Sequence, residues 1–153
     1  MWATEYSAVV ETEPEMVWAA LRDLHSGTRL SDRSDVFELH GPFAIGTELS
    51  VTPAGQDTLT STIVELEEPA RYADQTRFGD LTLLFRHTLA PLGPGRTEVT
   101  HRLEISGPGS DDVGPELGPQ ISADFPAAMA DLFAAARASA ARSGTAARDV
   151  STA

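Results

Sequence analysis

Four residues in the middle of the chain have side chains that could move protons: Tyr72, Asp74, His87 and His101. Histidine changes its charge near neutral pH, and a tyrosine hydroxyl can donate a proton to a developing enolate. Each of the four lies in a stretch where apolar and polar residues alternate, which is typical of a β-strand. If they face the same side of one sheet, they form a polar group in an apolar wall.

Three consecutive predicted strands carry these residues, over 72–78, 81–89 and 97–106. Gly79-Asp80 between the first two is typical of a two-residue hairpin turn, and such a turn fixes the register. Because side chains alternate between the faces of a strand, this register places the tyrosine and both histidines side by side. The other face is then charged and rich in threonine. The agreement across three strands supports the register.

The two histidines admit more than one interpretation. They could orient a ligand in a pocket, take part in catalysis, or form hydrogen bonds with the backbone and have no further role. In an apolar wall both cannot readily be charged, so we expect ligand affinity to fall as the pH drops from about 7.5 to about 5.5. With Asp74 they could suggest a metal, but no further ligand lies at a recognisable spacing. We predict no metal and no cofactor. His25 and His40, next to turns or strand ends, are expected to be exposed to solvent.

The composition excludes several classes of function. The chain has 153 residues, no cysteine and a formal net charge of −12. This length is typical of one domain with its own core, and the negative charge argues against nucleic acid as a partner. No apolar run is long enough to span a bilayer, and the N-terminus lacks the features of a signal peptide. We therefore expect a cytoplasmic protein, either a monomer or a homodimer.

Turn residues and periodicity predict the remaining elements. A strand over residues 5–11 is followed by a helix that opens at Thr12-Glu13-Pro14 and ends at Gly27. At most one more helical turn is expected in the polar loop after it, which makes a short helix pair. Three further strands are predicted at residues 36–40, 47–52 and 58–66.

A long amphipathic helix is predicted over residues 115–142. Its apolar residues recur at spacings of three and four and form one stripe, which comprises Ile121, Phe125, Met129, Leu132, Phe133 and Ala136. Pro126 should kink this helix or reset its start, because proline has no backbone N–H to donate. Residues 1–142 are expected to form a single domain. Residues 143–153 are small and polar without periodicity, so we predict a flexible tail.

The order of these elements, together with the local sequences at residues 13–18, 63–69 and 95–100, resembles the START-like, Bet v 1-like (SRPBCC) superfamily. Within it, the chain is similar to the bacterial polyketide cyclase/dehydrase and lipid-transport group. The resemblance implies an α+β helix-grip fold, in which a curved antiparallel sheet of six or seven strands wraps around a long C-terminal helix and encloses an apolar cavity. Members bind lipids, polyketides or other apolar molecules, and some carry out chemistry. They share no catalytic motif, so no site residue is carried over.

The implied cavity lies between the predicted inner face of the sheet and the stripe of the last helix. The residues expected to line it are Tyr72, Asp74, Thr76, Phe85, His87, His101, Leu103, Ile121, Phe125, Met129 and Leu132. Three functions stay open: binding or carrying a small hydrophobic ligand, a polyketide cyclase or dehydratase that works by proton transfer without a cofactor, and a partner-binding module like the related chaperone-activating domains.

Overall fold

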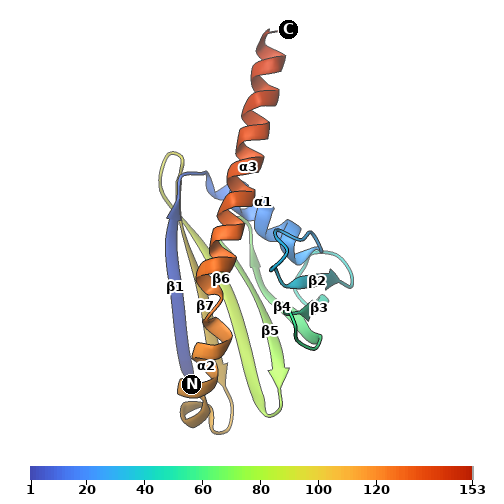
Figure 1. Ribbon diagram of the computed structural model, residues 1–153, viewed down its shortest axis with the longest axis vertical. Helices are drawn as coiled ribbons and strands as arrows, with labels where there is room; N and C mark the ends of the chain where they lie inside the picture. The colour runs from blue at the N-terminus through green and yellow to red at the C-terminus, as the bar shows by residue number, and fades with distance from the viewer. Residues whose placement is uncertain (153) are drawn as a thin grey trace.

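The structure is a computed structural model that describes the backbone of residues 1–152 and the side chains of residues 1–142. It contains one antiparallel sheet of seven strands in the order β1-β7-β6-β5-β4-β3-β2, with three helices (Figure 1). The strands are β1 (Trp2–Val10), β2 (Val36–Leu39), β3 (Glu48–Thr52), β4 (Leu59–Glu67), β5 (Arg71–Phe78), β6 (Leu81–Gly93) and β7 (Arg96–Ser106). The helices are α1 (Pro14–His25), α2 (Ser110–Ser122) and α3 (Phe125–Thr152).

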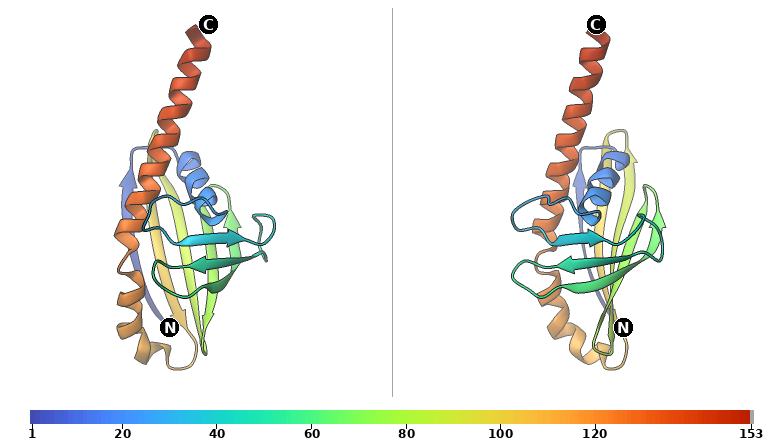
Figure 2. Two further views of the ribbon diagram at one scale, coloured as in Figure 1. Left: turned by 45° about the vertical axis from the view of Figure 1, so that its right-hand side comes forward. Right: turned by 90° about the vertical axis from the view of Figure 1, so that its right-hand side faces the viewer.

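The sheet bends strongly, and α2 and α3 lie along its inner side. Strands β2 and β3 run across the direction of the other strands, while α1 packs near one end of the sheet beside α3 (Figure 2). The core joins sheet and helices, because Leu89 and Val99 of the sheet belong to the same buried cluster as Met129 and Leu132 of α3. The predicted α+β helix-grip fold is confirmed.

The predicted register of the central strands is also confirmed. Phe78 pairs with Leu81 across the hairpin, Tyr72 pairs with His87, and His87 pairs with His101. The outer face carries a ladder of ion pairs that connects Arg71, Arg86 and Arg102 with Glu5, Glu65, Glu67 and Glu104. Charged side chains on one face and apolar ones on the other allow only this register, since a slip of one residue would bury the ladder.

Two predictions about the helices are wrong. The long helix begins earlier than predicted, at Ser110. Its break at Ala123 and Asp124 into α2 and α3 is one of the two outcomes predicted for Pro126, a reset of the helix start. The break precedes Pro126, which falls in the first turn of α3, where a missing N–H removes no helical hydrogen bond. Residues 26–35 form turns and bends, so α1 has no second helix beside it. Gly27, with φ of 116°, takes the chain out of the helix.

The structure continues α3 to Thr152, beyond the predicted end at Arg142. The flexible tail predicted over residues 143–153 falls on residues whose side chains lie outside the described ones, so it stays a prediction.

Helix α2 is held against the edge of the sheet by small residues. The indole of Trp2 lies against Gly114 and Gly118, and a Cβ atom at either glycine would overlap it. The N-terminal amine also pairs with Asp111 at 2.7 Å. These contacts set the position of α2 and of the break that follows it.

We expect Gly118→Ala to lower the free energy of unfolding by about 1–3 kcal/mol, because the added methyl group overlaps the indole. In an ordinary helix the same change is stabilising by about 0.5–1 kcal/mol. Urea denaturation of both proteins measures the difference. In a Trp2→Ala background the same substitution should become stabilising. If Gly118→Ala stabilises the otherwise unchanged protein, Trp2 does not pack on α2 as described.

Candidate functional site

A stack of aromatic rings connects the sheet with the start of α3. The rings of His87 and His101 lie 3.9 Å apart between centroids with an angle of 26° between their planes. Phe125 stacks on His101 at 3.7 Å and 15°. The break between α2 and α3 places Phe125 opposite the two histidines, so the three rings form one column from β6 to α3.

Beside this column, the carboxylate of Asp74 is buried and surrounded by donors. Ser61 on β4 donates to one oxygen, Oδ1, at 3.0 Å, and the Tyr72 hydroxyl donates to the other, Oδ2, at 2.7 Å. Both partners face the same side of the sheet as Asp74, which is 5% exposed. A carboxylate so deep in an apolar core needs such donors, since burying it without them would cost several kcal/mol.

The sequence prediction for His25 is wrong, and His25 belongs to this group. It lies at the end of α1 and is 3% exposed. Its Nδ1 donates to the carbonyl oxygen of Leu21 at 2.8 Å, and its Nε2 faces Oδ2 of Asp74 at 3.8 Å. Val17, Leu21 and His25 are four residues apart and share one face of α1, so helical spacing could have shown its inward direction. His40 is exposed as expected and contacts Ser50.

Burial controls the charge of the two stacked histidines. It lowers the pKa of His87 well below its usual value, and His101 and His25 lower it further. Burial also lowers the pKa of His101 to about 3, with a smaller contribution from His25. Both imidazoles are therefore neutral between pH 5.5 and 7.5. We therefore revise the prediction that ligand affinity falls between pH 7.5 and 5.5. Neither histidine gains a proton in this range, so their protonation gives no reason for such a loss.

The groups around Asp74 influence one another. Burial raises the pKa of Asp74, while His25 and the hydrogen bonds from Tyr72 and Ser61 lower it in part. Burial lowers the pKa of His25, and Asp74 opposes this shift. The pKa of Tyr72 rises through burial and through the charge and hydrogen bond of Asp74. The phenol of Tyr72 therefore keeps its proton and serves to hold Asp74 in place.

The other residues expected to line the cavity also point inward. Thr76, Leu103, Met129 and Leu132 are buried, and Phe85 and Ile121 pack at the edge of the second buried cluster. The structure thus brings the predicted set together on the inner face and the helices. Their contact with a ligand remains a prediction.

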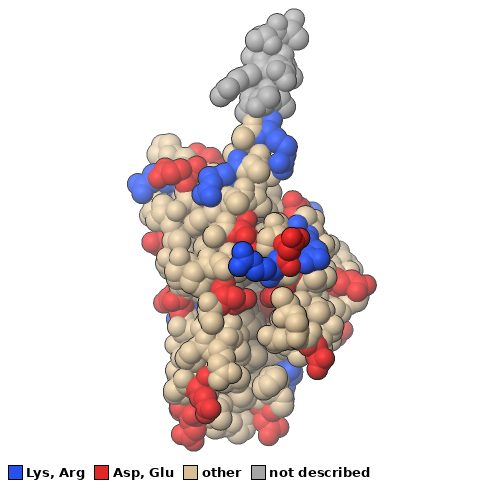
Figure 3. Space-filling view, viewed as in Figure 1, with Lys and Arg blue, Asp and Glu red and all other residues tan. Residues whose placement is uncertain are grey.

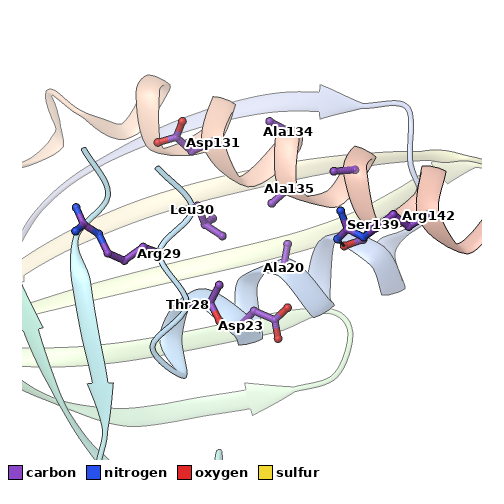
Figure 4. A pocket seen from close by; sticks show the side chains of 11 residues that line it. Ala20, Asp23, Thr28, Arg29, Leu30, Asp131, Ala134, Ala135, Ser139 and Arg142 are labelled. Atoms are coloured by element: carbon purple, nitrogen blue, oxygen red, sulfur yellow. Dashed lines mark hydrogen bonds between the residues drawn. The ribbon is translucent and has the colours of Figure 1, made fainter. Parts of the chain in front are cut away.

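A hollow of about 380 Å³ opens between α1, the segment after it and α3 (Figure 4). Ala20 and Ala135 line it and belong to the core or pack against it, so its inner wall is the surface of the core. Arg29 and Arg142 stand at its rim, and arginine side chains gather over this part of the molecule in Figure 3. Ser31 donates to Asp131 at 2.8 Å and so ties the loop after α1 to α3.

The residues present limit the chemistry further. Among the described side chains, no three His, Asp or Glu residues form a group that could hold a metal ion. The sequence contains no lysine, so no lysine side chain can form a Schiff base with a carbonyl compound. Over the described residues, none of the three helices combines the length and the hydropathy of a membrane-spanning segment.

Residues 1–140 match the family model for polyketide cyclase/dehydrase and lipid transport. The chain belongs to this family. A comparison with curated protein sequences found no match.

Solved structures with the same fold are distant in sequence. The Zhui aromatase/cyclase from Streptomyces sp. R1128 is 13% identical with a TM-score of 0.69, over 89% of this chain and 93% of that one. Norcoclaurine synthase from Thalictrum flavum, solved with dopamine and hydroxybenzaldehyde, is 15% identical with a TM-score of 0.66, over 86% of this chain and 83% of that one. At these identities the likeness shows the fold alone.

Two carboxyl groups, Asp35 in the loop before β2 and Asp124 in the break between α2 and α3, lie near enough for their charges to interact. Burial raises the pKa of Asp35 to about 6, and the nearby charge of Asp124 adds to the shift. Between pH about 4 and about 6 the folded protein thus keeps a proton that the unfolded chain releases, so stability falls as the pH rises through this window.

We expect Asp35→Asn to raise the melting temperature at pH 8, where the native aspartate is charged, and to leave it nearly unchanged at pH 4. Thermal unfolding at the two pH values measures this. The control is Asp57→Asn, which removes a carboxylate from an exposed loop and should show no such difference. An equal effect of Asp35→Asn at both pH values would contradict the raised pKa.

Proposed function

We propose that this protein binds a small, mostly apolar molecule, of aromatic or polyketide type, between the inner face of the sheet and helices α2 and α3. The proposal rests on one nitrogen atom of His87. Its Nδ1 is buried and has no hydrogen-bond partner among the described residues. A buried polar atom left without a partner costs about 1–3 kcal/mol. A ligand that pairs with Nδ1 would remove this penalty.

The surroundings of His87 favour a flat, uncharged ligand. Besides the column of His87, His101 and Phe125, the rings of Tyr72 and Phe43 stack at 5.6 Å with an angle of 4°. Aromatic faces of this kind attract planar apolar molecules. Because the stacked histidines are neutral, they offer hydrogen bonds without a charge that would select an anion.

The hollow between α1 and α3 is the proposed entrance. The hollow borders the core. Leu30, in the loop after α1, lines the hollow and also packs against the core. Among the described residues, the hydrogen bond from Ser31 to Asp131 ties this loop to α3, so opening of the loop would have to break it.

Family membership supports the proposal, since the family description covers polyketides and lipids. The structurally similar norcoclaurine synthase was solved with two aromatic molecules, dopamine and hydroxybenzaldehyde. Polyketide cyclase or dehydratase activity at the same site is the second candidate function, and the burial of Asp74 beside His25 favours it.

The test is a titration with N-phenyl-1-naphthylamine, an uncharged aromatic fluorophore whose N–H can donate to His87. We expect saturable binding that is weakened about tenfold by His87→Leu, because one hydrogen bond to a buried atom is worth about 1.4 kcal/mol. Affinity should stay constant between pH 5.5 and 7.5, since His87 and His101 remain neutral there.

His40→Leu is the matched control, because it removes an exposed histidine that does not belong to the proposed site. It should leave the affinity unchanged. Unfolding curves of the variants separate a loss of binding from a loss of fold. Absence of saturable binding to the wild type would overturn the proposed function, and unchanged affinity in folded His87→Leu would remove His87 from the site.

A further inference from the structure

A second hollow lies at the other end of the sheet from the proposed ligand entrance. It has a volume of about 280 Å³ and opens between one side of α2 and the turn that joins β5 and β6, at the end drawn lowest in Figure 1. Four apolar residues, two from the hairpin and two from α2, line it together with two polar residues of α2: Phe78, Leu81, Val113, Leu117, Glu116 and Gln120. None of them belongs to the proposed ligand site.

The apolar side chains of this hollow are partly open to solvent. Phe78 and Leu81 pair across the hairpin and face the inner side of the sheet, the side along which α2 and α3 lie. Phe78 is nevertheless 49% exposed, and Val113 on α2 is 42% exposed. Leu81 and Leu117 form the floor, because both pack against the second buried cluster, which contains Ile105. An exposed apolar surface that continues from the core is typical of a contact site.

Packing fixes both walls of the hollow. The indole of Trp2 lies against Gly114 and Gly118, so β1 holds α2 in place. The hairpin turn is held as well, because a Cβ atom on Gly107 would lie 2.6 Å from the carbonyl oxygen of Asp80. The segment that leads into α2 therefore packs closely on the turn. A pre-formed groove has little conformational entropy to lose when a partner binds.

The rim of the hollow is negatively charged. Glu116 lines it, Asp112 lies one turn earlier on α2, and Asp80 is in the hairpin turn. All three are exposed, and none of them forms an ion pair with a described side chain. Figure 3 shows acidic side chains gathered over this end of the molecule. Arg77 precedes Phe78, but strand alternation directs it to the outer face of β5.

The charge of the rim determines which partner fits the hollow. A second copy of this chain in a symmetric contact would place the same acidic residues opposite one another, and like charges across an interface are costly. Nucleic acid and anionic lipid are repelled for the same reason. A partner that presents an apolar face flanked by basic residues would satisfy both the hollow and its rim.

We propose that this hollow is a docking site for a basic amphipathic helix of another protein. The apolar face of the partner helix packs on Phe78 and Val113, and its lysine or arginine side chains pair with Asp80 and Glu116. Apolar anchors supply most of the affinity in this mode of recognition, and the flanking charges orient the helix and speed its association. The small contact is typical of a transient partner. The inference does not depend on the proposed ligand site.

The test uses a synthetic amphipathic helix of leucine and lysine that carries fluorescein. Its fluorescence anisotropy is followed as the protein is added, and we expect saturable binding. A peptide with the same leucine pattern, but with glutamate in place of lysine, should bind at least about tenfold more weakly, because the rim repels it. Absence of saturable binding of the lysine peptide would overturn the inference.

Two substitutions examine the charged and the apolar part of the hollow. Glu116→Lys replaces an attraction by a repulsion and should weaken binding of the lysine peptide about tenfold. Phe78→Ser removes an apolar anchor and should weaken it to a similar extent, about tenfold. Both side chains are exposed, so we expect both variants to fold, and urea denaturation verifies this. Val113→Ser replaces Phe78→Ser if the latter does not fold.

The matched controls make the same chemical changes at exposed positions elsewhere. Glu15→Lys lies on α1, and Leu92→Ser lies near the end of β6 that is opposite the hollow. Each should change the affinity by less than about twofold. If Glu15→Lys weakens binding as much as Glu116→Lys, the peptide responds to the net charge of −12 and not to the hollow, and the inference is wrong.

Other occupants of the hollow would give different results. If the wild type self-associates in sedimentation velocity and Phe78→Ser abolishes this, a second copy covers the hollow and the proposed partner is wrong. If folded Phe78→Ser no longer binds N-phenyl-1-naphthylamine, the hollow belongs to the ligand site, which also overturns the inference. Unchanged binding of this fluorophore with weakened binding of the lysine peptide supports a separate docking site.

Discussion

The burial of one carboxylate organises the interior of this protein. Asp74 lies in the middle of the inner face, where an unpaired charge would be strongly destabilising. Ser61 on the neighbouring strand, Tyr72 on the same strand and His25 on α1 meet this requirement together. The same need explains why α1 ends against the sheet, because only there can His25 face the carboxylate. A polar centre is thus supported by three elements that are distant in the sequence.

The sequence predicts the sheet better than the helices. Strand register repeats every two residues, and the hairpin at Gly79-Asp80 links adjacent strands, so local pattern alone brings Tyr72, His87 and His101 together. The exact course of the helices depends on packing. Whether Pro126 bends a helix or starts a new one is decided by where the chain meets the sheet. The sequence offers both outcomes and cannot choose between them.

His25 shows why a site is harder to predict than a fold. Its neighbours in sequence, Ser26 and Gly27, are turn residues, which favours an exposed position. Its helical neighbours Val17 and Leu21 favour the opposite, since they lie on the buried face of α1. The outcome depends on the contact with Asp74, a residue almost fifty positions away that no local pattern connects with α1. Long-range pairing of polar groups is the part of the site that the sequence alone leaves undetermined.

The two ends of the interior differ in their chemistry. Beneath α1, His25 lies 4.2 Å from the ring of Tyr72, and both contact the carboxylate of Asp74. Beneath α3, His101 stacks between His87 and Phe125, and no carboxylate among the described side chains pairs with it. The end under α1 therefore holds the titratable pair of His25 and Asp74, whereas the end under α3 offers flat apolar surfaces and neutral nitrogen atoms. His87 stands between the two and leaves one nitrogen unpaired. A ligand bound as proposed would have its apolar body against the column and its polar group beside His87, since the rings of the column carry no charge that would select an ion.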